Sequence, residues 1–220
     1  MKKTLTLIAA ILLLAGCGQK DNSPMVHELD GDEIQLLAPD LKGGSSVMEA
    51  LWQRRSDREY SDQDLSLREL SNLLWAATGV NRPEDGRRTN PTAINKQEIS
   101  VYAFLPQGVY LYEHASHSLK KMAEGDHRDL VAGFQNFAKE APLSLVIVED
   151  LSKFGERAEQ MSFLAHADAG YVSQNINLFC AAYSLATVPR ASMDHEAISA
   201  LLGLSPLQRP ILNNPVGHRR

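Results

Sequence analysis

Residues 161–188 constrain the fold more than any other part of the sequence. Asp168 is the only charged residue among them, and the composition predicts one long helix over residues 160–186. A helix that is apolar on nearly every side has to be buried on nearly every side. The polar side chains of Ser173 and Gln174 argue against a membrane span. In a domain of this size, a second copy of the chain is the simplest cover for such a helix, and a central helix in a monomer is the alternative.

The other elements predict an α+β fold, in which a mixed sheet is layered with helices. Ser66 and Glu69 have the spacing of a capping box, and Gly79 is placed to end the helix that they begin. Strand-like residues on either side of residues 106–108 predict a hairpin. The predicted helices span residues 47–52, 66–79, 128–139 and 195–202, and the predicted strands span residues 98–105, 109–112, 143–148, 187–189 and 210–216.

The first 17 residues have the order of a bacterial lipoprotein signal. A positive start is followed by a short apolar run and by small residues that lead to Cys17. The apolar run is shorter than the ~20 residues that span a bilayer, and an uncleaved anchor is the alternative. We expect a signal peptide over residues 1–16, a lipidated Cys17 with a tether over residues 17–43, and one folded domain over residues 44–220. This predicts a lipid anchor in the cell envelope, outside the cytoplasm, on the periplasmic face or at an outer membrane.

The charge balance argues against nucleic acid as a partner. The formal net charge is -5, and it becomes more negative when Lys2 and Lys3 leave with the signal peptide. Proteins that bind nucleic acid usually present a basic patch. Cys180 is the only cysteine after Cys17, and its apolar neighbours predict that it packs as a small hydrophobic residue.

A cluster of three arginines and a serine follows the first predicted helix. Arg54, Arg55, Ser56 and Arg58 lie within five positions of an acidic chain. Guanidinium and hydroxyl donors together suit the oxygens of a phosphate group, and backbone N–H groups at a turn can join them. The alternative is a solvated surface whose arginines form ion pairs of little energetic value.

Residues 54–60 (RRSDREY) resemble the opening signature of the FMN-dependent nitroreductases, a family that includes small dehydrogenases that oxidise peptide thiazolines. The resemblance runs from about residue 47 to the C-terminus. It implies an antiparallel sheet layered with helices, a homodimer, and an FMN phosphate held by Arg54, Ser56 and Arg58, with Arg55 as a further contact.

Two further motifs carry the resemblance. Residues 91–98 (PTAINKQE) are similar to a family segment that reaches the flavin from the partner subunit, which implies contacts from Pro91, Thr92, Asn95 and Gln97. The apolar helix that begins before residue 169 is similar to the helix at the core of the family's dimer.

The remaining matches follow that helix. The loop that contains Pro189, Arg190, Ala191 and Ser192 corresponds to the one that lies along the flavin ring and offers backbone N–H groups to its N5 side, although many members have Gly where Ser192 stands. Residues 215–220 (PVGHRR) resemble the family's terminal segment, which implies a further phosphate contact from Arg219 or Arg220.

The resemblance implies an FMN oxidoreductase that transfers hydride from a donor such as NAD(P)H to a nitroaromatic or quinone. A dehydrogenase direction, in which the substrate reduces FMN, is also open because NAD(P)H is scarce outside the cytoplasm. No side chain is expected to act as a catalytic acid, base or nucleophile, and no metal is expected. The alternatives are a non-catalytic lipoprotein that binds flavin or another phosphorylated ligand, and a dimeric scaffold.

The histidines add no second site to this interpretation. His114 and His117 are expected to be solvent-exposed in a turn, because no cysteines or clustered carboxylates complete a ligand set. His166 and Asp168 are expected to be satisfied polar groups at an interface.

Overall fold

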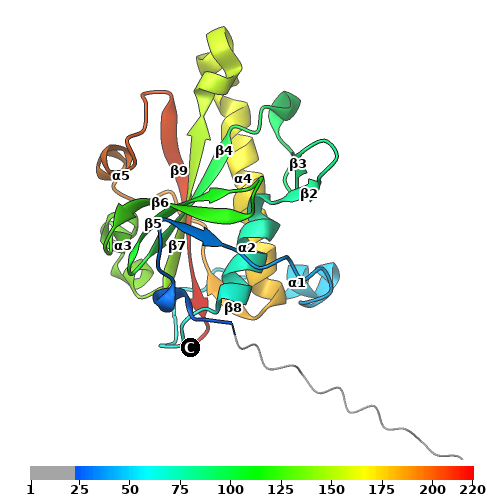
Figure 1. The fold of residues 1–220 in the computed structure, drawn as a ribbon, viewed down its shortest axis with the longest axis vertical. Coiled ribbons are helices and arrows are strands. Elements are labelled where there is room, and N and C mark those ends of the chain that lie inside the picture. The colour runs from blue at the N-terminus through cyan, green and yellow to red at the C-terminus, as the bar shows by residue number, and fades with distance from the viewer. Residues whose placement is uncertain (1–22) are drawn as a thin grey trace, which may run out of the picture.

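The computed structural model describes residues 23–220, so the predicted signal peptide and Cys17 lie outside the described residues. None of the helices in this part of the chain is long and apolar enough to cross a bilayer. Figure 1 shows a central sheet with helices packed on both of its faces. The layered α+β class predicted from the sequence is confirmed.

Seven strands form the central sheet, in the order β1-β6-β5-β4-β7-β9-β8, and each neighbouring pair is antiparallel. The predicted hairpin is confirmed as β4 and β5, and the predicted strand at residues 143–148 is confirmed as the buried β7. The strands of this sheet are β1 (Glu33–Gln35), β4 (Ile99–Leu105), β5 (Gly108–Glu113), β6 (Ser118–Glu124), β7 (Leu143–Asp150), β8 (Leu185–Thr187) and β9 (Gln208–His218).

The helices divide the core into two layers. The helices α2 (Leu67–Thr78) and α4 (Ala158–Ala182) cover one face, over the larger apolar core. The helices α3 (Arg128–Ala132) and α5 (His195–Leu202) cover the other face, over a smaller core. The helix α1 (Val47–Gln53) packs beside α4.

The start of α2 follows from its sequence. Ser66 Oγ accepts the Glu69 N–H at 3.2 Å, and the Ser66 N–H donates to Glu69 Oε2 at 2.8 Å, so the capping box is confirmed. The helix ends at Gly79, where a Cβ would lie 2.4 Å from Cδ1 of Trp75. The close approach of Trp75 therefore explains the glycine.

The long helix α4 is confirmed, although it ends earlier than predicted. Tyr183 caps it, and Ser184 adopts a positive φ of 58° before β8 begins. Cys180 is fully buried in the larger core, as predicted. The helix therefore ends because the chain has to turn back to the sheet edge.

Part of the predicted tether is folded onto the domain. Within residues 17–43, the 3-10 helix η1 (Val26–Glu28) and the strand β1 pack against the sheet. Val26, Leu29, Ile34 and Leu36 are all buried in the larger core. The packed unit in the described residues therefore begins before residue 44.

The predicted helix over residues 128–139 is wrong in one respect. It is broken into α3 and the 3-10 helix η3 (Asn136–Lys139). Gly133 adopts a positive φ of 55° between them, and Phe134 is 83% exposed. The glycine permits a conformation that ends α3 after two turns at most.

Candidate functional site

The arginine cluster lies on an extended loop that is fastened to the sheet. After α1 ends, the Asp57 N–H donates to the Thr187 carbonyl at 2.9 Å, which ties the loop to β8. Tyr60 is buried and pairs with Arg219, next to the end of β9. Residues 54–60 are therefore held by main-chain bonds to two strands, while the side chains of Arg54, Ser56 and Arg58 are left exposed.

Three of the predicted phosphate ligands have free donors. Arg54, Ser56 and Arg58 are exposed, and within residues 23–220 their side chains form no hydrogen bond or ion pair. The guanidinium of Arg58 lies 5.9 Å from the ring centroid of Phe137, which limits its position. The loop therefore presents a preorganised set of donors to an anion.

The other arginines of the cluster are already paired. Arg55 Nε contacts both carboxylate oxygens of Asp57, at 2.9 and 3.0 Å. Arg219 Nε lies 3.1 Å from Asp57 Oδ2. The structure thus brings Arg219 to the cluster, as the resemblance implied, but Asp57 neutralises part of the charge there.

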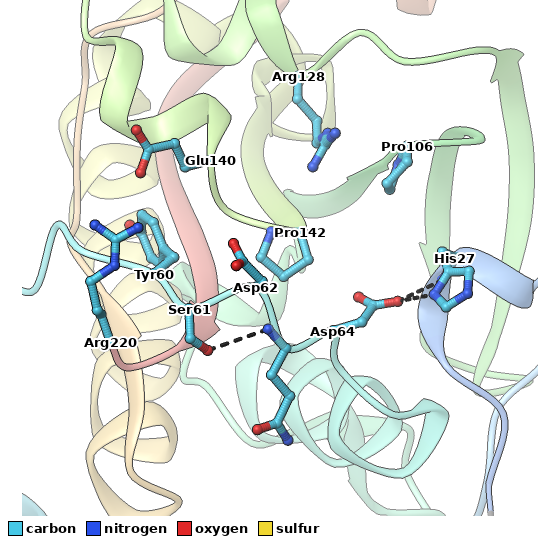
Figure 2. A pocket seen from close by; sticks show the side chains of 11 residues that line it. His27, Tyr60, Ser61, Asp62, Asp64, Pro106, Arg128, Glu140, Pro142 and Arg220 are labelled. Carbon is cyan, nitrogen blue, oxygen red and sulfur yellow. Dashed lines mark hydrogen bonds and ion pairs between the residues drawn. The ribbon is translucent and has the colours of Figure 1, made fainter.

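Arg220 lines a cavity beside the arginine loop, and Figure 2 shows this cavity. This cavity has a volume of about 530 Å³, and Arg220 lines it together with Tyr60, Asp62, Asp64 and Glu140. The three carboxylates of Asp62, Asp64 and Glu140 would repel a phosphate group in this cavity. The predicted phosphate contact therefore fits Arg219 better than Arg220.

The predicted flavin-edge loop is anchored by Arg190. Its side chain is 7% exposed and donates to the carbonyls of Val131 and Ala132 and to the side chains of Gln135 and Asn213. Burial lowers its pKa below the ordinary value. All the donors of this side chain point into the protein, so Arg190 fixes the loop and its guanidinium is not available to a ligand.

The two residues after Arg190 keep their main-chain donors. The Arg190 N–H donates to the Asn213 carbonyl at 2.8 Å, whereas the N–H groups of Ala191 and Ser192 have no hydrogen-bond partner within the described residues. Ser192 Oγ is buried and also lacks a partner there. Pro189 has no N–H and is exposed. The two N–H groups of Ala191 and Ser192 therefore remain for a ligand at this loop.

The second motif lines a separate cavity. Pro91, Thr92, Asn95 and Gln97 surround a space of about 420 Å³, and no residue of the 54–60 loop lines it. Three arginines from the hairpin of β2 (Val80–Arg82) and β3 (Arg87–Arg88) complete the walls: Arg82, Arg87 and Arg88. Within one chain, the second motif therefore lines a cavity that the arginine loop does not line.

Several large apolar side chains on α1 and α4 are exposed. Val47, Met48 and Trp52 on α1 are more than two-thirds exposed, and Phe163 and Tyr171 on α4 are about half or more exposed. Exposed apolar side chains of this kind are typical of surfaces that bind another protein.

The two turn histidines differ from the prediction. His114 is half-buried, and its Nε2 lies 2.7 Å from Nη2 of Arg88; burial and the Arg88 charge lower its pKa to about 4. His117 is half-buried between the Tyr112 hydroxyl and the Leu37 carbonyl. The expectation of solvent exposure is wrong because the folded N-terminal segment and the β2–β3 hairpin cover this turn.

Sequence reasoning also missed a pair of buried acids. Glu98 is fully buried at the start of β4, and Asp168 on α4 is 4% exposed. The sequence holds two signals, a glutamate at the start of an apolar strand and a single charged residue in the apolar helix, but neither signal shows that the two side chains lie close together.

Comparisons with known proteins agree with this geometry. A relative from Methanocaldococcus jannaschii, named as a nitroreductase, is 30% identical over 202 residues, covering 86% of this chain and 98% of that protein. A crystal structure from Ralstonia eutropha, also named as a nitroreductase, is 35% identical with a TM-score of 0.82, covering 90% of this chain and 94% of that chain. A chain of the Escherichia coli microcin synthetase complex shares the fold at 17% identity, with a TM-score of 0.67 over 97% of this chain and 85% of that chain.

The family model agrees over most of the folded region. The model of the nitroreductase family matches residues 51–218, which include the arginine loop, the second motif, α4 and the loop after it. The chain therefore belongs to the nitroreductase family of oxidoreductases.

Proposed function

We propose that this protein is an FMN-dependent oxidoreductase that acts as a homodimer and is anchored to the cell envelope by a lipid on Cys17. The observation that carries the proposal is the set of free donors of Arg54, Ser56 and Arg58 on a loop that is fixed to β8 and β9. These donors match the phosphate of FMN, which is nearly dianionic at neutral pH, through charge-assisted hydrogen bonds.

The loop after β8 would bind the flavin ring. The N–H groups of Ala191 and Ser192 are free, and Arg190 holds them in place from below. Fixed N–H donors beside N5 stabilise the negative charge that a reduced ring carries, without a cost of reorganisation. When bound, FMN supplies hydride transfer between a donor such as NAD(P)H and an organic acceptor such as a nitroaromatic or a quinone.

A second copy of the chain would complete the site. Thr92, Asn95 and Gln97 line a cavity apart from the arginine loop, so they can reach the same flavin only from a partner subunit. The exposed apolar side chains of α1 and α4 supply a surface for that dimer. The small-molecule donor and acceptor would then enter between the two chains.

The direction of hydride transfer depends on the electron donor that is present. With NAD(P)H the protein acts as a reductase, and with an oxidisable organic substrate it acts as a dehydrogenase, as in the thiazoline-oxidising subgroup. An envelope location favours the second direction or a donor other than NAD(P)H.

Purification of the full-length protein from membranes tests the proposal. The expected preparation is yellow, its flavin absorption bleaches with dithionite and returns in air, and it turns over NADH with a nitroaromatic or quinone. Bound flavin without turnover would indicate a non-catalytic flavin-binding lipoprotein. A colourless protein that ignores added FMN would contradict the proposal and favour a structural role for the arginines.

A further inference from the structure

We propose that Glu98 and Asp168 share one proton and thereby position residues 92–97, the segment that the proposed function assigns to the flavin of the partner subunit. Neither residue touches the proposed cofactor, so both are positioning residues. The flavin part of this inference rests on the proposed function, whereas the proton-sharing part does not.

The two carboxyl groups are buried together. Glu98 has no exposed surface, and no donor from another residue within residues 23–220 reaches either of its carboxyl oxygens. Burial and, next, the carboxyl of Asp168 raise the pKa of Glu98, so the two groups lie close enough to form a hydrogen bond when Glu98 carries a proton. Two adjacent carboxylates that are shielded from water cannot both stay ionised. One proton on Glu98 removes the repulsion and makes Glu98 a donor to Asp168.

Asp168 connects this pair to the segment. Its Oδ2 accepts the N–H of Ala93 at 2.6 Å, at the start of the 3-10 helix η2 (Ala93–Asn95). Three non-glycine residues of the segment have positive φ angles: Ile94 at 46°, Asn95 at 55° and Gln97 at 51°. Such a conformation is costly and persists only where the surroundings enforce it.

Contacts other than this bond also hold the segment, and one of them is the donation from Gln97 Nε2 to the Gly86 carbonyl at 3.1 Å. The Gln97 N–H donates to Thr92 Oγ1 at 3.2 Å within the segment, and Lys153 Nζ reaches the Gln97 carbonyl at 3.0 Å on the exposed side. The Ala93–Asp168 bond is the buried contact that links the segment to α4. Loss of the proton from Glu98 would place a second charge beside the acceptor of that bond.

The charged neighbours of Glu98 set the pH range. Lys153 on η4 (Leu151–Arg157) and Arg88 on β3 favour its ionised form, whereas Asp168 disfavours it. Glu149 on β7 lies opposite the next residue, Ile99. Burial, together with the contact to Asp168, raises the pKa of Glu98 to about 7. The segment should therefore be held firmly below pH 7 and loosened above it.

Hydrogen–deuterium exchange of the flavin-free protein tests the proton-sharing part. Peptides that cover residues 92–97 are compared at pH 6 and pH 8.5 after correction for the intrinsic exchange rate. We expect protection in the wild type to fall about tenfold at the higher pH. Glu98→Gln keeps a neutral donor toward Asp168 and should retain protection at both pH values. The same change of protection with pH in the wild type and in Glu98→Gln would overturn the inference.

Flavin titration tests the link to the site. We expect the FMN dissociation constant of the wild type to rise about tenfold between pH 6 and pH 8.5 relative to that of Glu98→Gln, a comparison that cancels the titration of FMN itself. Glu149→Gln is the matched control: Glu149 is also buried, and burial also raises its pKa, but it makes no hydrogen bond to the segment. This variant should keep the wild-type pH dependence of FMN affinity.

The outcomes separate the two proposals. Parallel FMN curves for the wild type and Glu98→Gln would overturn the positioning role while leaving the flavin function intact. Absence of FMN binding in every variant at every pH would overturn the proposed function and the flavin role together. The exchange experiment would then still decide whether the proton is shared.

Discussion

Asp57 and Arg219 form an ion pair, with 3.1 Å between Oδ2 and Nε, that joins the loop after α1 to the end of β9. Asp57 also holds Arg55. One carboxylate therefore fastens the C-terminus to the arginine loop and leaves Arg54 and Arg58 as the unpaired cations.

Asp57→Asn should lower the free energy of unfolding by about 1 kcal/mol at low salt, since both partners of the Arg219 pair are about three-quarters or more buried and a surface pair alone contributes less. The loss should shrink in concentrated salt, where the charges are screened. Urea denaturation at both salt concentrations measures it. Asp62→Asn, which removes an exposed carboxylate with no partner in the described residues, should change little. Equal losses for the two variants would contradict the structural role of Asp57.

Arg190→Gln should destabilise the protein by about 3 kcal/mol or more, because it leaves two buried carbonyls and two side-chain acceptors without donors. Arg209→Ala is the control, since its pair with Glu159 is largely exposed and should contribute less than about 1 kcal/mol. Thermal and urea denaturation of both variants measure the difference. A small effect of Arg190→Gln would show that this guanidinium is free for another role.

The pair of Glu69 and His218 should give the protein a stability maximum in mildly acidic solution. Their Oε1 and Nε2 atoms are 3.4 Å apart. The hydrogen bond to Glu69 raises the pKa of His218 above 6.5, so its contribution is lost as the pH rises through the raised value. Although burial opposes the change, hydrogen bonds from His218 and Ser66 lower the pKa of Glu69 below 4.5, so its contribution is lost as the pH falls through the lowered value.

The contribution of the pair to the free energy of unfolding is therefore fully present between pH 4.5 and pH 6.5, the ordinary pKa values of Glu69 and His218. His218→Gln should flatten the pH dependence of the free energy of unfolding on the alkaline side of that range. Denaturation curves between pH 4 and pH 9 measure it. An unchanged profile in the variant would show that the pair does not form.

Trp52→Glu should weaken the proposed homodimer. Trp52 is 86% exposed on α1 beside α4, and a charge at the centre of an apolar interface should raise the dimer dissociation constant at least about tenfold. Analytical ultracentrifugation measures it. Phe134→Glu places the same charge at an equally exposed ring away from α1 and α4, and it should leave the dimer intact.

Local sequence signals predicted much of the fold. The capping box of α2, the hairpin of β4 and β5, and the apolar α4 each depend on neighbouring residues alone, and all three are present. By contrast, β6 contains two consecutive lysines, and β1 is three residues long. Both become strands because an adjacent strand pairs with them, and a single segment of sequence does not show its partner.

In the candidate site, too, the local features were predictable from the sequence and the long-range contacts were not. The arginine loop is contiguous in sequence, so the proximity of Arg54, Ser56 and Arg58 followed from their spacing. The pairing of Arg219 with Asp57, and the burial of Arg190, depend on contacts between distant segments. For the same reason the contact between Glu98 and Asp168 had no signature in the sequence.

The most direct test of the central claim compares FMN with riboflavin, which lacks the phosphate. The wild type should bind FMN about a hundredfold more tightly than riboflavin, and Arg54→Gln combined with Arg58→Gln should remove most of that preference while leaving riboflavin affinity unchanged. Arg55→Gln should retain most of the preference, because Asp57 already pairs with Arg55. Equal affinity of the wild type for FMN and riboflavin, or binding of neither, would contradict the assignment of the arginine loop to a flavin phosphate.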